Sequence, residues 1–110
     1  MDIKLEKIND IRLIVLDGDL CVESTHKFKD TFKTILKEKN AKVLIDFAKV
    51  PFIDSSGIAA LIEVCQNLVK VNGRLCLCHV NKKIINVFEI TKVHKLFKIF
   101  ESHQEALRSL

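Results

Sequence analysis

The chain has 110 residues, of which 48% are apolar and 29% charged, and its formal net charge is +4, which fits one globular domain over residues 1–110. A membrane helix needs about 20 apolar residues, and no apolar run in the chain approaches this length. The N-terminus also lacks the apolar region of a signal peptide. We therefore expect a cytoplasmic protein without membrane insertion. The lysines are spread along the chain with no arginine cluster or aromatic platform beside them, which argues against nucleic-acid binding.

The first part of the chain predicts two strands and a helix. Ile3–Ile8 and Ile11–Leu16 are extended apolar segments on either side of the turn signal Asn9-Asp10, so they can form a hairpin. Ser24 or Thr25 can cap the helix that follows. The apolar residues of this helix recur with the spacing of one helical face, which indicates an amphipathic helix lying on a core: Phe28, Phe32, Ile35 and Leu36.

A strand, a helix and a second strand follow in the middle of the chain. Val43–Phe47 is a short aliphatic run, typical of a strand covered on both faces. Ser56–Val71 predicts a helix that is apolar over most of its surface, and Gly73 occupies the position of a C-terminal cap. Leu75–Val80 predicts the next strand. This order predicts a right-handed parallel crossover.

The last part of the chain predicts a helix, a short strand and a final helix. Lys82–Ile90 predicts the helix and Phe97–Phe100 the strand. The capping-box pattern of Ser102 and Glu105 marks the start of the final helix. In the helix Lys82–Ile90 three apolar residues are expected to face inward: Ile84, Val87 and Phe88. The sum is an α/β domain with a mixed sheet of four to five strands and four to five helices packed mainly on one side.

The segment Val50–Ile58 lies between a buried strand and a helix, at the carboxyl edge of the predicted sheet, where open α/β folds place their ligands. Asp54 and Ser55 stand where side-chain oxygens can accept from the free N–H groups of a helix start. Capping alone would account for both. Capping does not explain Gly57, because a glycine inside a helix lowers stability by about 0.5–1 kcal/mol relative to alanine. We expect it to leave the first turn open to another chain.

These residues resemble the signature of the bacterial anti-sigma factor antagonists, the STAS domain family. The core of the resemblance is Asp54–Gly57, which follows the strand Val43–Phe47. One position departs from the family pattern: Cys21 stands where the family often has an aspartate near the phosphorylation loop. The resemblance covers nearly the whole chain and includes four outer segments: Gly18–Leu20, Asn72–Leu75, Val87–Thr91 and Leu96–Phe100.

The resemblance implies a protein switch without catalysis or a cofactor of its own. In the family, the unphosphorylated antagonist binds an anti-sigma factor that is a serine kinase and so frees the sigma factor that acts in transcription; phosphorylation ends the binding, and a phosphatase resets it. Carried over by position, the acceptor is Ser55, with Ser56 as second choice. Asp54 would orient the loop or the hydroxyl, Gly57 would permit close contact, and an apolar rim would surround them. The implied partner-binding residues are Phe52, Asp54, Ser56, Gly57 and Ile58.

Three other functions compete with this hypothesis. A serine hydrolase would need a Gly-x-Ser-x-Gly elbow and a placed histidine, and the sequence shows neither. Cys76 and Cys78 share a strand face but lack the Cys-x-x-Cys spacing of a zinc knuckle, so we expect reduced buried thiols, no metal, and no assigned role for any histidine. The alternative within the family is a non-switching STAS subunit of a lipid-transport ABC complex or a stressosome-like assembly.

Overall fold

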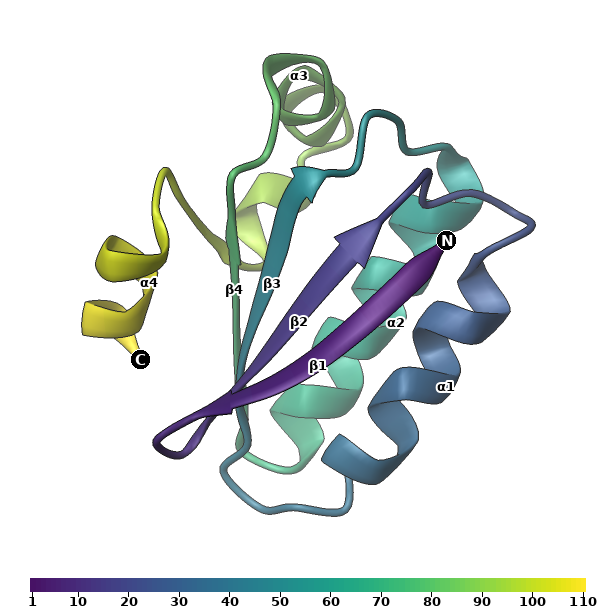
Figure 1. The fold of residues 1–110 in the computed structure, drawn as a ribbon. Helices are drawn as coiled ribbons and strands as arrows, with labels where there is room; N and C mark the ends of the chain where they lie inside the picture. Colours follow the sequence, from purple (N-terminus) through teal and green to yellow (C-terminus); the bar gives the residue numbers. More distant parts are fainter.

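The computed structural model describes residues 1–110, in which five strands form one sheet in the order β1-β2-β3-β4-β5 (Figure 1). β1 pairs with β2 antiparallel, and every other neighbouring pair is parallel. The predicted mixed α/β sheet is therefore confirmed. The strands are β1 (Asp2–Ile8), β2 (Ile11–Asp17), β3 (Lys42–Lys49), β4 (Arg74–Cys78) and β5 (Lys98–Phe100).

The first two strands form the predicted hairpin. Ile8 pairs with Ile11 across the two-residue loop, in which Asn9 has a positive φ of 57°. Asparagine tolerates this left-handed conformation better than most residues, which is why it suits a tight turn. The hairpin makes β1 an edge strand, and most of its side chains are exposed.

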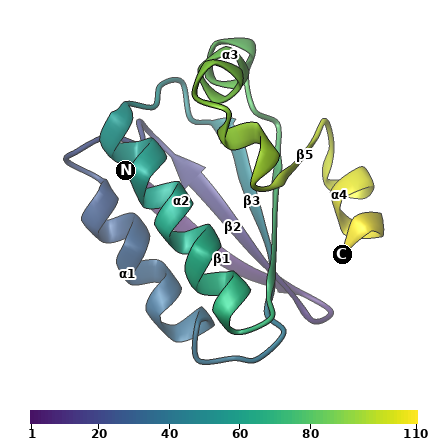
Figure 2. The same ribbon diagram turned by 180° about the vertical axis from the view of Figure 1, so that it is seen from behind.

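Two long helices cover one face of the sheet, and a short one lies on the other (Figures 1 and 2). α1 (Thr25–Ile35) and α2 (Ser55–Lys70) pack side by side on the first face. α3 (Lys82–Thr91) and the 3-10 turn η1 (Val93–Lys95) follow β4. α4 (His103–Ser109) contacts β3, β4 and β5 from the opposite face. The prediction that the helices pack mainly on one side is confirmed.

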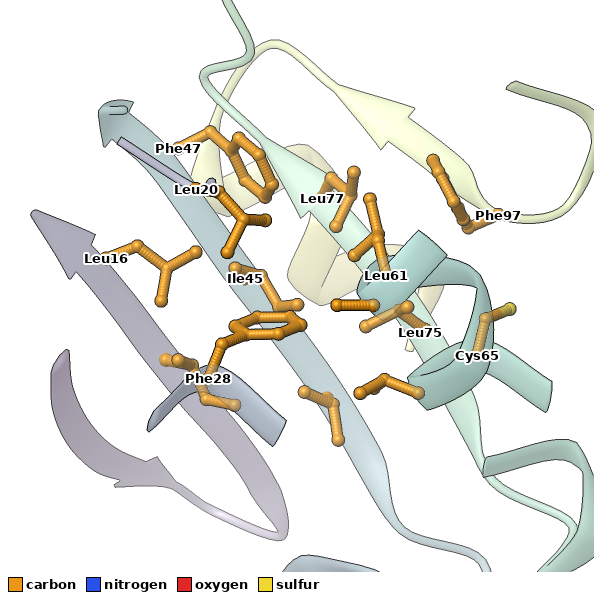
Figure 3. Packing of buried hydrophobic residues seen from close by; sticks show 14 of the residues in the cluster. Leu16, Leu20, Phe28, Ile45, Phe47, Leu61, Cys65, Leu75, Leu77 and Phe97 are labelled. Carbon is orange, nitrogen blue, oxygen red and sulfur yellow. The ribbon is translucent and has the colours of Figure 1, made fainter. Parts of the chain in front are cut away.

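The strand side chains alternate between two apolar clusters of unequal size. Val43, Ile45 and Phe47 join the larger cluster of 23 buried residues between the sheet and α1 and α2 (Figure 3). Leu44 points to the other face, where a cluster of six buried residues includes Ala106 of α4. The period-2 alternation of β3 thus divides one aliphatic run between the two faces. The large cluster holds α2 in place, and α2 begins at the candidate site.

Three local predictions differ from the structure. Ser24 lies at the N-cap of α1 but makes no capping bond; its Oγ accepts from the Cys21 N–H at 3.0 Å and donates to the Asp19 carbonyl at 2.8 Å. Val87 is only half-buried. At the end of α2 the left-handed residue is Asn72, with φ 58°, whereas Gly73 lies where a Cβ would come within 2.7 Å of a neighbouring carbonyl.

None of the helices combines the length and the apolar character needed to cross a lipid bilayer.

Candidate functional site

Two loops meet at the carboxyl edge of the sheet, one after β2 and one after β3. Because β2 and β3 are parallel, both loops leave from the same edge. Leu20 and Ile53 form an isolated parallel bridge between them. The Leu20 N–H donates to the Phe52 carbonyl at 3.0 Å, and the Asp54 N–H donates to the Leu20 carbonyl at 3.2 Å. The two loops therefore continue the sheet beyond its named strands and have a fixed register.

Asp54 joins these loops to the start of α2. It is the N-cap residue, with extended backbone angles, and its Oδ1 accepts from the Gly57 N–H at 2.8 Å. Its Oδ2 accepts from the Val22 N–H of the other loop at 3.2 Å. One carboxylate therefore caps the helix and ties down the first loop at once. The role of Asp54 in binding a partner stays a prediction.

Ser55 is the first residue of α2, and its side chain is exposed, whereas Ser56 is half-buried. Since Asp54 supplies the cap, the helix does not require the Ser55 hydroxyl for its own start. The alternative that both residues merely cap the helix therefore accounts for Asp54 only. Ser55 presents a hydroxyl at the positive end of a sixteen-residue helix, a position that favours an anion.

Gly57 is buried, and its surroundings differ from the expectation. A Cβ at this position would overlap the Leu20 carbonyl oxygen and would lie 2.8 Å from Cγ1 of Ile53. The first turn of α2 is therefore not open to another chain, because a loop of the same chain fills the space. The glycine is needed for a close approach within the molecule, and this approach sets where Ser55 stands.

Apolar side chains flank the exposed serine. Phe52 is 53% exposed and Val22 is 63% exposed, and they come from the two loops that Asp54 ties together. Ile58 lies half-buried against the large core, so it offers less surface than the sequence suggested. Sequence reasoning missed Val22, and its only signal was an aliphatic residue in a loop. Phe52 and Val22 are thus exposed apolar side chains on the two loops that meet at the start of α2, a feature that suits contact with a protein.

The loop after β3 has a second anchor that the sequence did not indicate. The side-chain amide of Asn81 donates to the Val50 carbonyl at 3.1 Å. The side-chain oxygen of the same residue accepts from the Ile84 N–H at 2.9 Å and caps α3. Asn81 thus joins the start of α3 to the loop that carries Phe52 and helps to keep that loop in one conformation.

The STAS domain family model matches residues 2–106. This chain belongs to the STAS domain family. It is 25% identical over 104 residues to a Thermotoga neapolitana protein that is provisionally named an anti-sigma factor antagonist. The matched region covers 94% of this chain and 92% of that protein. The predicted family membership is confirmed.

Two solved structures show how closely this STAS domain follows the family fold. A crystal structure of a Thermotoga maritima protein, also provisionally named an anti-sigma factor antagonist, has a TM-score of 0.90 at 21% identity and covers 97% of this chain and 92% of that one. The Bacillus cell fate determinant SpoIIAA, solved in its phosphorylated form, has a TM-score of 0.75 at 20% identity and covers 98% of both chains. At these identities the likeness concerns the fold.

Proposed function

We propose that this STAS domain is an anti-sigma factor antagonist that works by partner switching. The unphosphorylated form binds an anti-sigma factor serine kinase and frees the sigma factor. The kinase transfers the γ-phosphoryl group of ATP to Oγ of Ser55, which loses its proton, and ADP leaves. The modified domain dissociates, and a phosphatase hydrolyses the phosphoserine. The observation that carries this proposal is an exposed Ser55 hydroxyl at a helix start that Asp54 already caps.

The fold of the antagonist should tolerate the phosphate. A phosphoserine adds about −1.5 to −2 charges and three strong acceptor oxygens. At Ser55 these charges meet the N-terminus of α2, where free N–H groups and the helix dipole favour an anion. The two hydrogen bonds of Asp54 involve other donors, so they need not change. Modification can therefore leave the domain folded.

The interface with the kinase should not tolerate the phosphate on Ser55. Burying an unmatched dianion against a surface that fits a hydroxyl costs on the order of 2–5 kcal/mol, the usual cost of an unpaired interfacial charge. At about 1.4 kcal/mol per factor of ten, this weakens binding by roughly 30- to 5,000-fold. The exposed Phe52 and Val22 beside the serine would contact the partner and exclude water from the site, which makes the unpaired charge costly.

The direct test is to incubate the purified domain with candidate anti-sigma kinases and ATP and to map the phosphosite by mass spectrometry. We expect one phosphate on Ser55. Ser55→Ala should abolish labelling, and the matched variant Ser56→Ala should be labelled like the wild type. Labelling that survives in Ser55→Ala but disappears in Ser56→Ala would move the acceptor by one residue.

Binding separates the switch from its alternative. We expect Ser55→Asp to weaken kinase binding at least about 30-fold in calorimetry, while Ser55→Ala binds like the wild type. A domain that ignores every such kinase and co-purifies instead with an ABC transporter or a stressosome-like assembly would contradict the proposal and favour a non-switching subunit.

A further inference from the structure

Four side chains that can bind a metal converge on the face of the sheet that α4 covers. Each of Asp46, Cys78, His79 and His103 offers one ligand atom, and these atoms all lie within 4.8 Å of one another. They come from the second half of β3, the end of β4, the residue after β4 and the first residue of α4. Figure 1 shows α4 beside β4, away from α1 and α2. The cluster is therefore separate from the core face against which α2 packs.

Strand register brings the first two ligands together. Asp46 and Cys78 are direct partners in the parallel pairing of β3 with β4. Cys78 belongs to the small apolar cluster with Leu44 and Ala106, so its thiol points toward α4. Side chains alternate along a strand, so a regular β4 would send the next residue, His79, to the opposite face.

His79 breaks this alternation because its backbone is left-handed, with a φ of 58°. Its ring consequently lies on the same side as Cys78, with its centroid 5.3 Å from that of His103. A left-handed conformation is uncommon for a residue with a Cβ, so the fold holds this histidine in a conformation with some strain. The strain places an imidazole beside a buried thiol and a buried carboxylate.

The carboxylate of Asp46 is already oriented as a ligand would need to be. Its Oδ1 accepts from the Ala48 N–H at 2.8 Å, which fixes the plane of the carboxylate. Its Oδ2 lies 2.8 Å from Nε2 of His103. Asp46 is one of only two buried polar residues in the chain. A metal ion could take the place of the proton between Asp46 and His103, and the bond to Ala48 would remain to hold the carboxylate.

We propose that these four residues form a binding site for a zinc ion, with Oδ2 of Asp46, Sγ of Cys78 and one ring nitrogen each of His79 and His103 as ligands. Tetrahedral zinc with bonds of about 2.0–2.3 Å needs ligand atoms about 3.3–3.6 Å apart. The separation between Asp46 Oδ2 and His103 Nε2, 2.8 Å, and the upper limit of 4.8 Å for the cluster bracket this value. Side-chain movements of about 1 Å suffice. On binding, the Cys78 thiol releases its proton to solvent, and the neutral histidines donate lone pairs.

The donor set favours zinc over the other ions that proteins commonly hold. One thiolate and two imidazoles suit a borderline-soft ion, whereas magnesium and calcium prefer sites made of oxygen alone. The ion would reach the site past His79, which is exposed, and His103, which is half-buried.

A nucleophilic cysteine is the competing interpretation of the same residues. Burial, then Asp46 and then Cys76 raise the pKa of the Cys78 thiol to about 12, and its side chain is fully buried. A buried, neutral thiol is a poor nucleophile, and in the proposed site it ionises only when the metal ion displaces its proton. A hydrogen bond between Asp46 and His103 would account for two of the four residues and leave the convergence of the other two without a role.

The structure also changes which cysteines belong together. The sequence suggested Cys76 with Cys78, because both lie on one face of a strand. Cys76 is buried on that face but lies outside the cluster, whereas Cys78 meets partners from β3 and α4. Cys76 is therefore a matched control: a buried thiol on the same strand and the same face that should not bind the ion.

The test uses the full chain without an affinity tag, reduced and stripped of metal, titrated with cobalt(II) as a spectroscopic substitute for zinc. We expect one cobalt per chain, tetrahedral bands in the visible and a thiolate-to-cobalt charge-transfer band in the near ultraviolet, all abolished by one equivalent of zinc. The charge-transfer band should vanish in Cys78→Ala and persist in Cys76→Ala. A band that persists in Cys78→Ala, or the absence of any thiolate band in the wild type, overturns the proposal.

A second set of variants covers the case in which Cys78→Ala does not fold. His79→Gly removes a ligand at an exposed position, and glycine accepts the positive φ without strain. We expect it to weaken zinc binding by more than about 100-fold, since loss of a residue that only supports a ligand costs 10- to 100-fold. His26→Ala, an exposed histidine beside Asp30, should leave the affinity unchanged. Equal losses in both variants would indicate adventitious binding at the surface.

Zinc should also stabilise the domain, because it would join α4 to two strands. With free zinc at a hundred times the dissociation constant, linkage predicts a rise in Tm on the order of 10 °C. The rise should be absent in His79→Gly. A Tm that zinc leaves unchanged in the wild type contradicts the site.

Discussion

The two loops at the carboxyl edge of the sheet have a buried layer and an exposed layer, made from residues that alternate along the same short segments. Leu20 and Ile53 belong to the large core, and Gly57 is buried beside them; these three residues form the buried layer (Figure 3 shows Leu20). Val22, Phe52 and Ser55 form the exposed layer. Asp54 joins the layers through one hydrogen bond to Val22 in the first loop and one to Gly57 in α2. The difference indicates that the buried residues set the positions of the loops, whereas the exposed residues are free to change or to contact a partner without disturbing the fold.

The strongest test of this separation is Leu20→Ala. Leu20 is fully buried, and its removal leaves a cavity beneath both loops, so the free energy of unfolding should fall by about 3–5 kcal/mol. Urea denaturation measures this free energy of unfolding. Val22→Ala, two residues away and 63% exposed in the wild type, should change the same quantity by less than about 0.5 kcal/mol. Similar losses in the two variants would mean that the layers are not distinct.

Gly57→Ala tests the close approach between α2 and the first loop. The added methyl would overlap the Leu20 carbonyl, so backbone must shift, and we expect a loss of about 2–3 kcal/mol in denaturant unfolding. Because the shift displaces Ser55, kinase binding should weaken as well. Ser56→Ala, the neighbouring change without a clash, should leave the free energy of unfolding nearly unchanged. A fully stable Gly57→Ala would show that α2 can move away from Leu20 at no cost.

Asp54→Ala removes the link between the layers. It loses the helix cap and the bond to Val22, so we expect a loss of about 1–2 kcal/mol. Hydrogen exchange should accelerate at the amides of Gly57 and Val22. Asp54→Asn keeps one acceptor oxygen, so the Gly57 amide should stay protected while that of Val22 does not. Unchanged exchange in Asp54→Ala would contradict the bridging role.

Ser55→Asp should have the smallest effect on stability. The new carboxylate gains from the N-terminus of α2 and is repelled by Asp54, so the change in the free energy of unfolding should stay below about 0.5 kcal/mol. Thermal unfolding followed by circular dichroism measures it. Kinase binding in the same variant should nevertheless fall at least about 30-fold. A drop of several degrees in Tm would place Ser55 in the buried layer.

Much of the fold follows from local patterns. The aliphatic run of β3, the helical spacing of Phe28 and Phe32, and the capping pattern of Ser102 and Glu105 each predicted an element that the structure contains. The sequence predicts the start of α2 to within one residue, with Ser55 at the helix N-terminus. These signals are local because the periods of helices and strands, and the chemistry of caps, act within a few residues.

The rest depended on contacts between distant segments. The sequence could not show that the space above Gly57 is filled by the Leu20 carbonyl, or that Val22 stands exposed beside Phe52. Nor could it bring His103, 57 residues along the chain from Asp46, to that carboxylate. Periodicity assigns a residue to a face, but strand register and loop pairing decide which side chains meet on it, because those contacts join parts of the chain with no local relation. The sequence determined the elements and the place of Ser55 at a helix start; the tertiary structure decided which side chains are exposed there and what surrounds them.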